Sequence, residues 1–291
     1  WRDWSQQLRL HQWAKNALLF VPLLAAHKLG DAAMLLNGLL AFVLFGLCAS
    51  SVYLLNDLLD LQDDRQHHRK RHRPLASGAV PIKSVLLLFP LLTLTAFAGA
   101  AWLLPQQFVL ALLCYYGLTL SYSLLLKRYM GVDVIVLATL YTLRVIAGTF
   151  AFGVTLTFWM LAFSMFLFLS LALVKRYTEL RDSRLKGKSE LTPGRGYYPA
   201  DLEMVSALGA ASGYLSVMVL ALYTQDQTTA ALYQHPQLIW LACPLLLYWV
   251  TRTWMLAHRG QMHEDPVLFA IKDRVSLLVG ALFAAVFWIA A

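Results

Sequence analysis

The residues best suited to chemistry stand where a long apolar run ends, in the segment SSVYLLNDLLDLQDDRQHHRKRHRPLASG at residues 50–78. Asn56, Asp57, Asp60 and Asp64 form the pattern N-D-x-x-D-x-x-x-D there. Residues three and four apart share one face of a helix, so the three aspartates are predicted to form a stripe of carboxylates. A hard cation would relieve their repulsion, and Mg2+ suits carboxylates that leave room for substrate phosphates. We therefore predict a Mg2+ site on Asp57, Asp60 and Asp64, with Asn56 beside it, for a diphosphate-bearing substrate.

A second interpretation of the same segment is a solvated helix end whose acids pair with the basic run from Arg65 to Arg73. The register of four positions at the end of an apolar run favours the metal site. Most of the basic run is typical of an anchor that contacts anionic lipid. Arg73 stands just before Pro74 and Gly78, and we expect it to contact a phosphate.

Other ionisable residues lie at the ends of apolar runs or inside them. Lys15 and Asn16 precede the first run, where a Lys side chain can either extend along the apolar surface towards water or bind phosphate. Asp133 and Arg144 fall in one run, about three helical turns apart, so they share a face but are too distant to pair. A charge as deep as Arg144 should face the protein interior and an anionic ligand.

A second group of ionisable residues follows the run at 157–175, in the segment LALVKRYTELRDSRLKGKSEL. Lys175, Arg176, Tyr177 and Glu179 open it. The segment is mainly cationic, which would suit further phosphate groups opposite the acidic motif. The alternative is again a lipid-facing anchor.

The elements that must position these residues are apolar helices. Of the 291 residues 59% are hydrophobic and 14% charged, whereas globular domains carry about 25% charged residues. Runs of about 18 or more apolar residues can span a bilayer, and backbone in lipid must be helical. We expect an all-α membrane bundle of about nine transmembrane helices in a single domain, residues 1–291. The approximate spans are 16–28, 32–56, 82–104, 107–126, 132–152, 157–175, 199–223, 236–256 and 275–291.

The distribution of charge predicts the topology. If successive spans cross the membrane in opposite directions, the loops and adjoining span ends on one side contain all of the 24 Lys and Arg residues except Lys28 and Arg144. Positively charged loops stay cytoplasmic, so the N-terminus and the acidic motif are predicted to face the cytoplasm, across an inner or plasma membrane. This asymmetry accounts for the net charge of +8 without nucleic acid. The chain begins with Trp, which leaves room for a soluble domain upstream.

Together these features resemble the UbiA superfamily of intramembrane prenyltransferases, whose members carry the same acidic pattern after the second of nine helices. The decaprenyl-phosphate phosphoribosyltransferase branch is the most similar. The resemblance covers essentially the whole chain, and its strings are QWAKN at 12–16, NDLLDLQDDR at 56–65, KRHRPLASG at 70–78, YSLLLKRYMGVDVIVLATLYTLRVIAG at 122–148 and KRYTEL at 175–180. Members that act on aromatic acceptors have a second aspartate-rich motif after the sixth helix. This chain has KRYTELRDSR there instead, which favours the phosphoribosyl branch.

The resemblance implies transfer of 5-phosphoribose from phosphoribosyl diphosphate to a polyprenyl phosphate, with Mg2+ on Asp57, Asp60 and Asp64. It implies contacts with the substrates and membrane lipids, and it is compatible with a homo-oligomer. The substrate-binding residues we expect are Lys15, Asn16, Arg73, Lys127, Asp133, Arg144, Lys175, Arg176, Tyr177 and Glu179. Two alternatives stay open: a prenyltransferase that acts on an aromatic acceptor, and a transporter or lipid-binding membrane subunit without catalysis.

Overall fold

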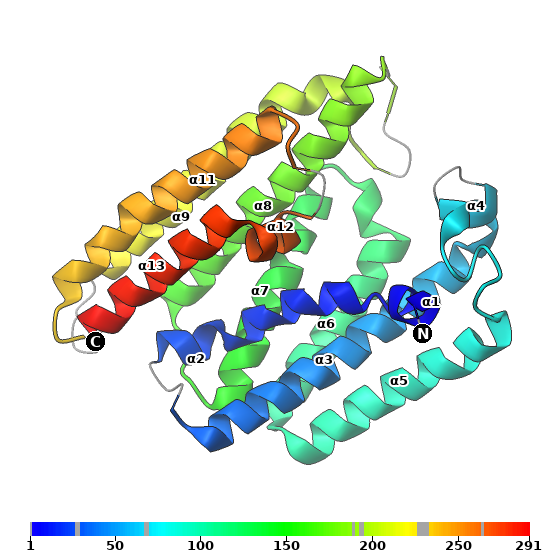
Figure 1. Ribbon diagram of the computed structural model, residues 1–291, viewed down its shortest axis with the longest axis horizontal. Helices are drawn as coiled ribbons and strands as arrows, with labels where there is room; N and C mark the ends of the chain where they lie inside the picture. The colour runs from blue at the N-terminus through cyan, green and yellow to red at the C-terminus, as the bar shows by residue number, and fades with distance from the viewer. Residues whose placement is uncertain are drawn as a thin grey trace. The chain divides into compact units, whose positions relative to one another are not determined.

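The structure, a computed structural model, describes residues 2–26, 30–66, 70–187, 190–191, 195–225, 233–262 and 265–291. Every regular element in these ranges is helical, which confirms the predicted all-α class (Figure 1). The chain divides into two compact units, which are described separately. Unit 1 comprises Trp1–Leu23, Lys28–Ser123 and Leu143–Val154, and unit 2 comprises Leu24–His27, Leu124–Thr142 and Thr155–Ala291. The expectation of a single domain over 1–291 stays a prediction.

Seven helical segments in the described residues are long and apolar enough to cross a membrane. They are α3 (Ala32–Leu59), α5 (Ile82–Leu103), α6 (Gln106–Leu124), α7 (Val132–Phe152), α8 (Phe158–Leu185), η4 with α9 (Pro199–Tyr223), and η5 with α11 (Pro236–His258). The pair α12 (Pro266–Lys272) and α13 (Arg274–Ala290) would make an eighth span, although it bends by 80°. The protein is thus a multi-pass membrane protein. The count of nine and the cytoplasmic N-terminus stay predictions.

The N-terminal segment differs from the helix expected at 16–28. It consists of α1 (Arg2–Gln7), the 3-10 helix η1 (Leu10–Phe20) and the short α2 (Val21–Ala25). The 3-10 geometry lengthens the segment along its axis relative to an α-helix of the same number of residues. None of these pieces reaches the length that a spanning α-helix needs.

Unit 1 is built on α3, which packs along both η1 and α5. Three further short elements follow in this part of the chain: α4 (Leu61–Gln66) and η2 (Lys70–His72) in unit 1, and η3 (Leu126–Arg128) in unit 2. Gly46 of α3 lies against the indole of Trp13, close enough that a Cβ there would overlap the ring. The Trp13 Nε1 group donates a hydrogen bond of 2.9 Å to Ser50 Oγ, one turn further along α3. The N-terminal segment is therefore fixed against the helix that carries the acidic motif.

In unit 2, α8 packs along the helix α9 (Leu202–Tyr223), which begins after the short η4 (Pro199–Asp201). The helix α9 also contacts α11 (Ala242–His258), which follows η5 (Pro236–Leu241). Small side chains allow this close packing. At one such position the Ser170 Oγ donates a hydrogen bond of 2.7 Å to the Gly209 backbone carbonyl. The candidate spans differ widely in burial: 67% of the apolar window of α7 is buried, and only 17% of that of α5. The surface of α5 is accordingly suited to lipid, whereas α7 is suited to carry polar residues inside protein.

Candidate active site

The acidic motif crosses a break between two helices. The helix α3 ends at Leu59, Asp60 is its C-cap with φ −88° and ψ 6°, and α4 begins at Leu61. The predicted stripe therefore lies on two consecutive helices rather than on one continuous helix. Backbone hydrogen bonds cross the break, from the Asp60 N–H to the Asn56 carbonyl at 2.9 Å and from the Asp64 N–H to the Asp60 carbonyl at 2.8 Å.

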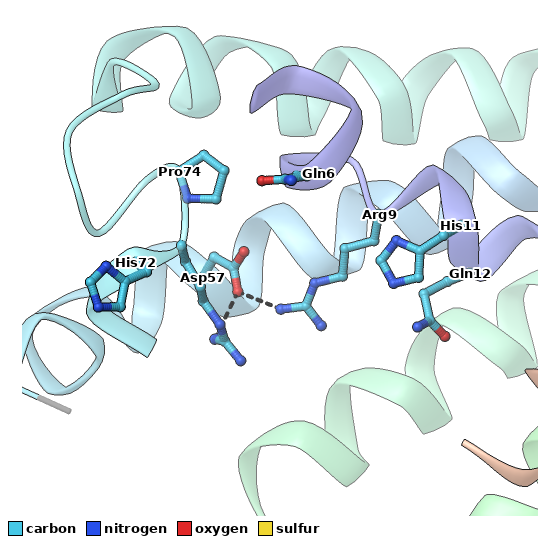
Figure 2. A pocket seen from close by; sticks show the side chains of 8 residues that line it. Gln6, Arg9, His11, Gln12, Asp57, His72 and Pro74 are labelled. Carbon is cyan, nitrogen blue, oxygen red and sulfur yellow. Dashed lines mark hydrogen bonds and ion pairs between the residues drawn. The ribbon is translucent and has the colours of Figure 1, made fainter. Parts of the chain in front are cut away.

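Asp57 is the most heavily bonded residue of the motif. The residue is 4% exposed, and its carboxylate accepts hydrogen bonds from Gln7 Nε2 at 2.9 Å, Arg9 Nη2 at 2.7 Å and Arg73 Nη1 at 3.2 Å. Figure 2 shows Arg9 reaching Asp57 from the N-terminal segment. Three donors on one buried carboxylate compensate for much of its lost hydration.

Asp64 lies close to the same cation. Its Oδ2 accepts from Arg73 Nη1 at 2.6 Å, and its Oδ1 lies 3.6 Å from Lys70 Nζ. The Asp64 Oδ1 atom is buried and has no hydrogen-bond partner. The nitrogen of Arg73 thus lies between Asp57 and Asp64, as the second interpretation of the sequence expected for acids that pair with the basic run.

The same arrangement fits a divalent cation in two respects. Asp57 and Asp64 converge on one positively charged group, and Asp64 keeps a buried oxygen that accepts no hydrogen bond and lies 3.6 Å from the Lys70 ammonium. Carboxylate oxygens are the ligands that Mg2+ prefers, and it commonly takes only one or two from the protein. Among the residues described, no group of three or more His, Cys, Asp or Glu side chains is placed to share a metal. The structure therefore brings two of the three predicted metal ligands together.

The remaining motif residues lie beside this pair. Asp60 is partly exposed. Asn56 donates from Nδ2 to Ser123 Oγ at 2.8 Å, which links α3 to the end of α6. The roles predicted for Asp60 as a metal ligand and for Asn56 beside it stay predictions.

Arg144 and Asn16 form a second polar cluster within unit 1. Arg144 is 4% exposed and donates from Nε to Asn16 Oδ1 at 3.2 Å and from Nη2 to Tyr115 Oη at 3.0 Å. Its guanidinium also lies over the rings of Tyr115 and Phe45, at 4.8 and 5.3 Å from their centroids. Lys15, the neighbour of Asn16, is 7% exposed. The sequence predicted functional roles for all three polar residues, and the structure joins Asn16 to Arg144.

Asp133 and Arg176 form an ion pair in unit 2. Arg176 Nη2 lies 2.6 Å from Asp133 Oδ2, and their side chains are 1% and 0% exposed. Tyr197 donates to Asp133 Oδ1 at 2.6 Å, and Arg176 also contacts Glu179. Burial and this hydrogen bond to Asp133 raise the pKa of the Tyr197 phenol, so it stays a donor. The sequence placed Asp133 and Arg176 in the substrate site but did not pair them.

The other predicted residues of unit 2 are held by partners that the sequence did not indicate. Lys175 Nζ lies 3.3 Å from Asp265 Oδ2, and the Tyr141 hydroxyl donates to the same carboxylate at 3.0 Å. The Tyr177 hydroxyl shares a hydrogen bond of 2.9 Å with His258 Nδ1. Lys127 lies in η3 and is partly exposed. Their predicted contacts with substrate stay predictions.

Sequence reasoning missed two residues at the carboxylate pair, Gln7 and Arg9. Gln7 is 1% exposed and accepts from the Leu75 backbone N–H at 3.0 Å while it donates to Asp57. Arg9 lies just before QWAKN, but its sequence position does not distinguish it from the other basic residues on the predicted cytoplasmic side. Gln7 offers no signal in the sequence, because an isolated Gln in a polar segment is usually solvated.

Comparison with known proteins identifies the family. The model of the UbiA prenyltransferase family matches residues 17–278. The chain belongs to the UbiA prenyltransferase family. Within this UbiA chain, 287 residues are 37% identical to an uncharacterized protein, y4nM, of Sinorhizobium fredii; the match covers 98% of the chain but 55% of that relative, so the chain spans about half of its length. A decaprenyl-phosphate phosphoribosyltransferase of Mycobacterium tuberculosis is 31% identical over 288 residues, which cover 97% of the chain and 90% of the relative.

The UbiA fold is also found among solved structures. A UbiA homolog from Archaeoglobus fulgidus bound to DMAPP and Mg2+ superposes with a TM-score of 0.70, covers 98% of both chains and is 17% identical. At that identity the likeness establishes the fold alone. The predicted resemblance to the family is confirmed, and UbiA members are prenyltransferases.

Proposed function

We propose that the protein transfers 5-phosphoribose from phosphoribosyl diphosphate to a polyprenyl phosphate and releases diphosphate. The observation that carries the proposal is the convergence of Asp57 and Asp64 on one cationic group, beside the arginines Arg9 and Arg73. Such a site can bind a metal-bound diphosphate and a further phosphate. The 31% identity with a decaprenyl-phosphate phosphoribosyltransferase over 97% of the chain supports the same reaction.

In this reaction a phosphate oxygen of the lipid forms a bond to C1 of the ribose, and the C1–O bond to diphosphate breaks with its electron pair on diphosphate. The attacking oxygen is already anionic, so no strong general base is needed. Asp57 and Asp64 would hold Mg2+, with Asp60 as a third ligand, and the cation would neutralise charge on the departing diphosphate. Arg73 and Arg144 supply fixed positive charge that positions phosphates.

The site is proposed to face the cytoplasm across an inner or plasma membrane, because the positively charged loops flank the acidic motif. The test is a transfer assay with the purified full chain, labelled phosphoribosyl diphosphate, polyprenyl phosphate and Mg2+. A lipid-linked labelled product that disappears with EDTA supports the proposal. No product from the folded wild-type chain would refute it.

A second candidate is transfer of a prenyl group from its diphosphate to an aromatic acceptor. It is favoured by the fold shared with a homolog that binds DMAPP and Mg2+. Labelled prenyl diphosphate with an aromatic acid in the same assay separates the two reactions, since only one of the donors should be consumed.

A further inference from the structure

A pocket of about 370 Å³ opens beside Asp57 within unit 1. This volume lies in the range of small-molecule sites. The residues that line it are Gln6, Arg9, His11, Gln12, Asp57, His72, Arg73 and Pro74. Seven of these side chains are polar, and Asp57 is the one acid among the described residues of the lining. The pocket therefore suits an anionic, hydrogen-bonding ligand better than a hydrocarbon chain.

Arg9 occupies a strained position at the edge of this pocket. It has φ 51° and ψ 45°, in the left-handed region, at the junction of α1 and η1. Among the described residues it is the one non-glycine residue with positive φ. Such a conformation costs about 1–3 kcal/mol and persists where the surroundings impose it. Its guanidinium lies 4.6 Å from the centroid of the Tyr53 ring and 2.7 Å from Asp57.

The walls on both sides of Arg9 are fixed. Gln7 joins Asp57 to the backbone of Leu75, two residues beyond Arg73. The backbone N–H of Ser77 in turn donates to the carbonyl of Arg73 at 2.9 Å. A ligand in the pocket would therefore meet a preorganised set of donors, which reduces the entropy lost on binding.

Asp57 cannot keep all of its present donors if it also binds a cation. The Arg9 guanidinium then needs another anionic partner in place of Asp57. Figure 2 shows Arg9, His11 and Gln12 on one side of Asp57 and His72 on the other. Asp64 lies outside the lining of the pocket. The pocket with Arg9 therefore adjoins the carboxylate pair, since Arg73 lines the pocket and also binds Asp64.

A phosphoribosyl donor carries phosphate at both ends, a diphosphate on C1 and a monoester on C5. A prenyl diphosphate carries hydrocarbon where the second phosphate would be. We propose that the pocket beside Asp57 is the subsite for the 5-phosphate monoester of the donor, with Arg9 as its anchor and specificity-determining residue. The proposal rests on the proposed function for the identity of the donor. It explains why a strained arginine and several neutral donors gather next to the carboxylate pair.

The experiment compares the wild type with Arg9→Gln and Arg9→Lys in the full chain. The matched control is Arg2→Gln, which makes the same charge change at an exposed position of α1, outside the pocket lining. Ribose 5-phosphate and inorganic pyrophosphate are titrated separately into each purified protein by calorimetry. The KM and kcat for phosphoribosyl diphosphate are measured in parallel.

Removal of a charge-assisted contact should weaken ribose 5-phosphate binding about 10- to 100-fold in Arg9→Gln and raise the KM for the donor similarly. Pyrophosphate binding should change less than threefold, Arg9→Lys should recover part of the loss, and Arg2→Gln should match the wild type. The inference is overturned if the wild type does not bind ribose 5-phosphate, if Arg9→Gln binds it as well as the wild type, or if ribose 5-phosphate and pyrophosphate weaken together. Absence of phosphoribosyl transfer by the wild type refutes the proposed function instead, whatever the two titrations show.

Discussion

The buried ion pair between Asp133 and Arg176 permits a decisive test of whether Arg176 is structural. Removing one partner of a buried pair costs about 3–5 kcal/mol, because the other charge stays buried without compensation. Arg176→Met leaves Asp133 with the hydrogen bond from Tyr197, which still offsets part of the loss. We therefore expect the low end, a free energy of unfolding lower by about 3 kcal/mol.

Asp133→Asn should cost a similar amount, since among the described residues Arg176 then keeps Glu179 as its one acidic partner. The double variant removes both charges, and replacement of a whole buried pair is often neutral. We expect the double variant to recover at least 2 kcal/mol of the roughly 6 kcal/mol that additive losses would predict.

Unfolding in detergent, followed by circular dichroism as denaturant is added, gives the three free energies. Because a change of 1 kcal/mol shifts Tm by about 2–4 °C in chains of 150–250 residues and by less in longer ones, each single variant of this chain should melt a few degrees lower, up to about 6 °C. Additive losses in the double variant would refute the pairing argument. A double variant that is stable but cannot transfer substrate would support the contact with substrate phosphate that the sequence predicted.

Three further changes test other parts of the structure. Asp57→Asn should lower transfer activity more than about 100-fold through lost electrostatic stabilisation, with the far-ultraviolet circular dichroism unchanged; wild-type turnover in this variant would contradict the site. Gly148→Ala should destabilise by about 2 kcal/mol or more through overpacking, because a Cβ there would lie 2.1 Å from the Leu19 carbonyl oxygen; an unchanged Tm would show that the close approach is absent. Trp13→Phe should cost about 1 kcal/mol through the lost hydrogen bond, because the Ser50 hydroxyl still donates to the Leu8 carbonyl. Ser50→Ala should cost more, because it leaves both the Trp13 Nε1 group and the Leu8 carbonyl without this partner, and a smaller loss in Ser50→Ala would contradict this account.

The long helices could be predicted from the sequence because apolar length and backbone hydrogen bonding leave a single solution in lipid. The expected spans 82–104 and 132–152 nearly match Ile82–Leu103 and Val132–Phe152. The segment at 16–28 does not form the predicted spanning helix, because Lys15, Asn16 and Pro22 keep its apolar run short. Hydrogen bonds of Asn16 to Phe42 of α3 and Arg144 of α7 hold the segment in place. Apolar composition alone does not contain that information.

The site was predictable to the extent that it depends on local spacing. The acidic pattern identified Asp57 and Asp64, whose carboxylates converge. The pairing of Asp133 with Arg176 spans more than forty residues of sequence, and such contacts depend on tertiary packing that periodicity does not encode. The break at Asp60 was missed for a related reason, since helix ends are set by capping and packing as much as by residue type.

Gln7 donates one hydrogen bond and accepts another, and both are lost when the N-terminal residues are removed. An amide has a donor at one end and an acceptor at the other, and here both ends are committed, to Asp57 and to Leu75. A version trimmed to begin at Leu10 would keep every long helix. Its Asp57 carboxylate would, however, lose the hydrogen bonds that Gln7 and Arg9 donate. Such a fragment should insert and look intact by most structural criteria while lacking part of its catalytic apparatus.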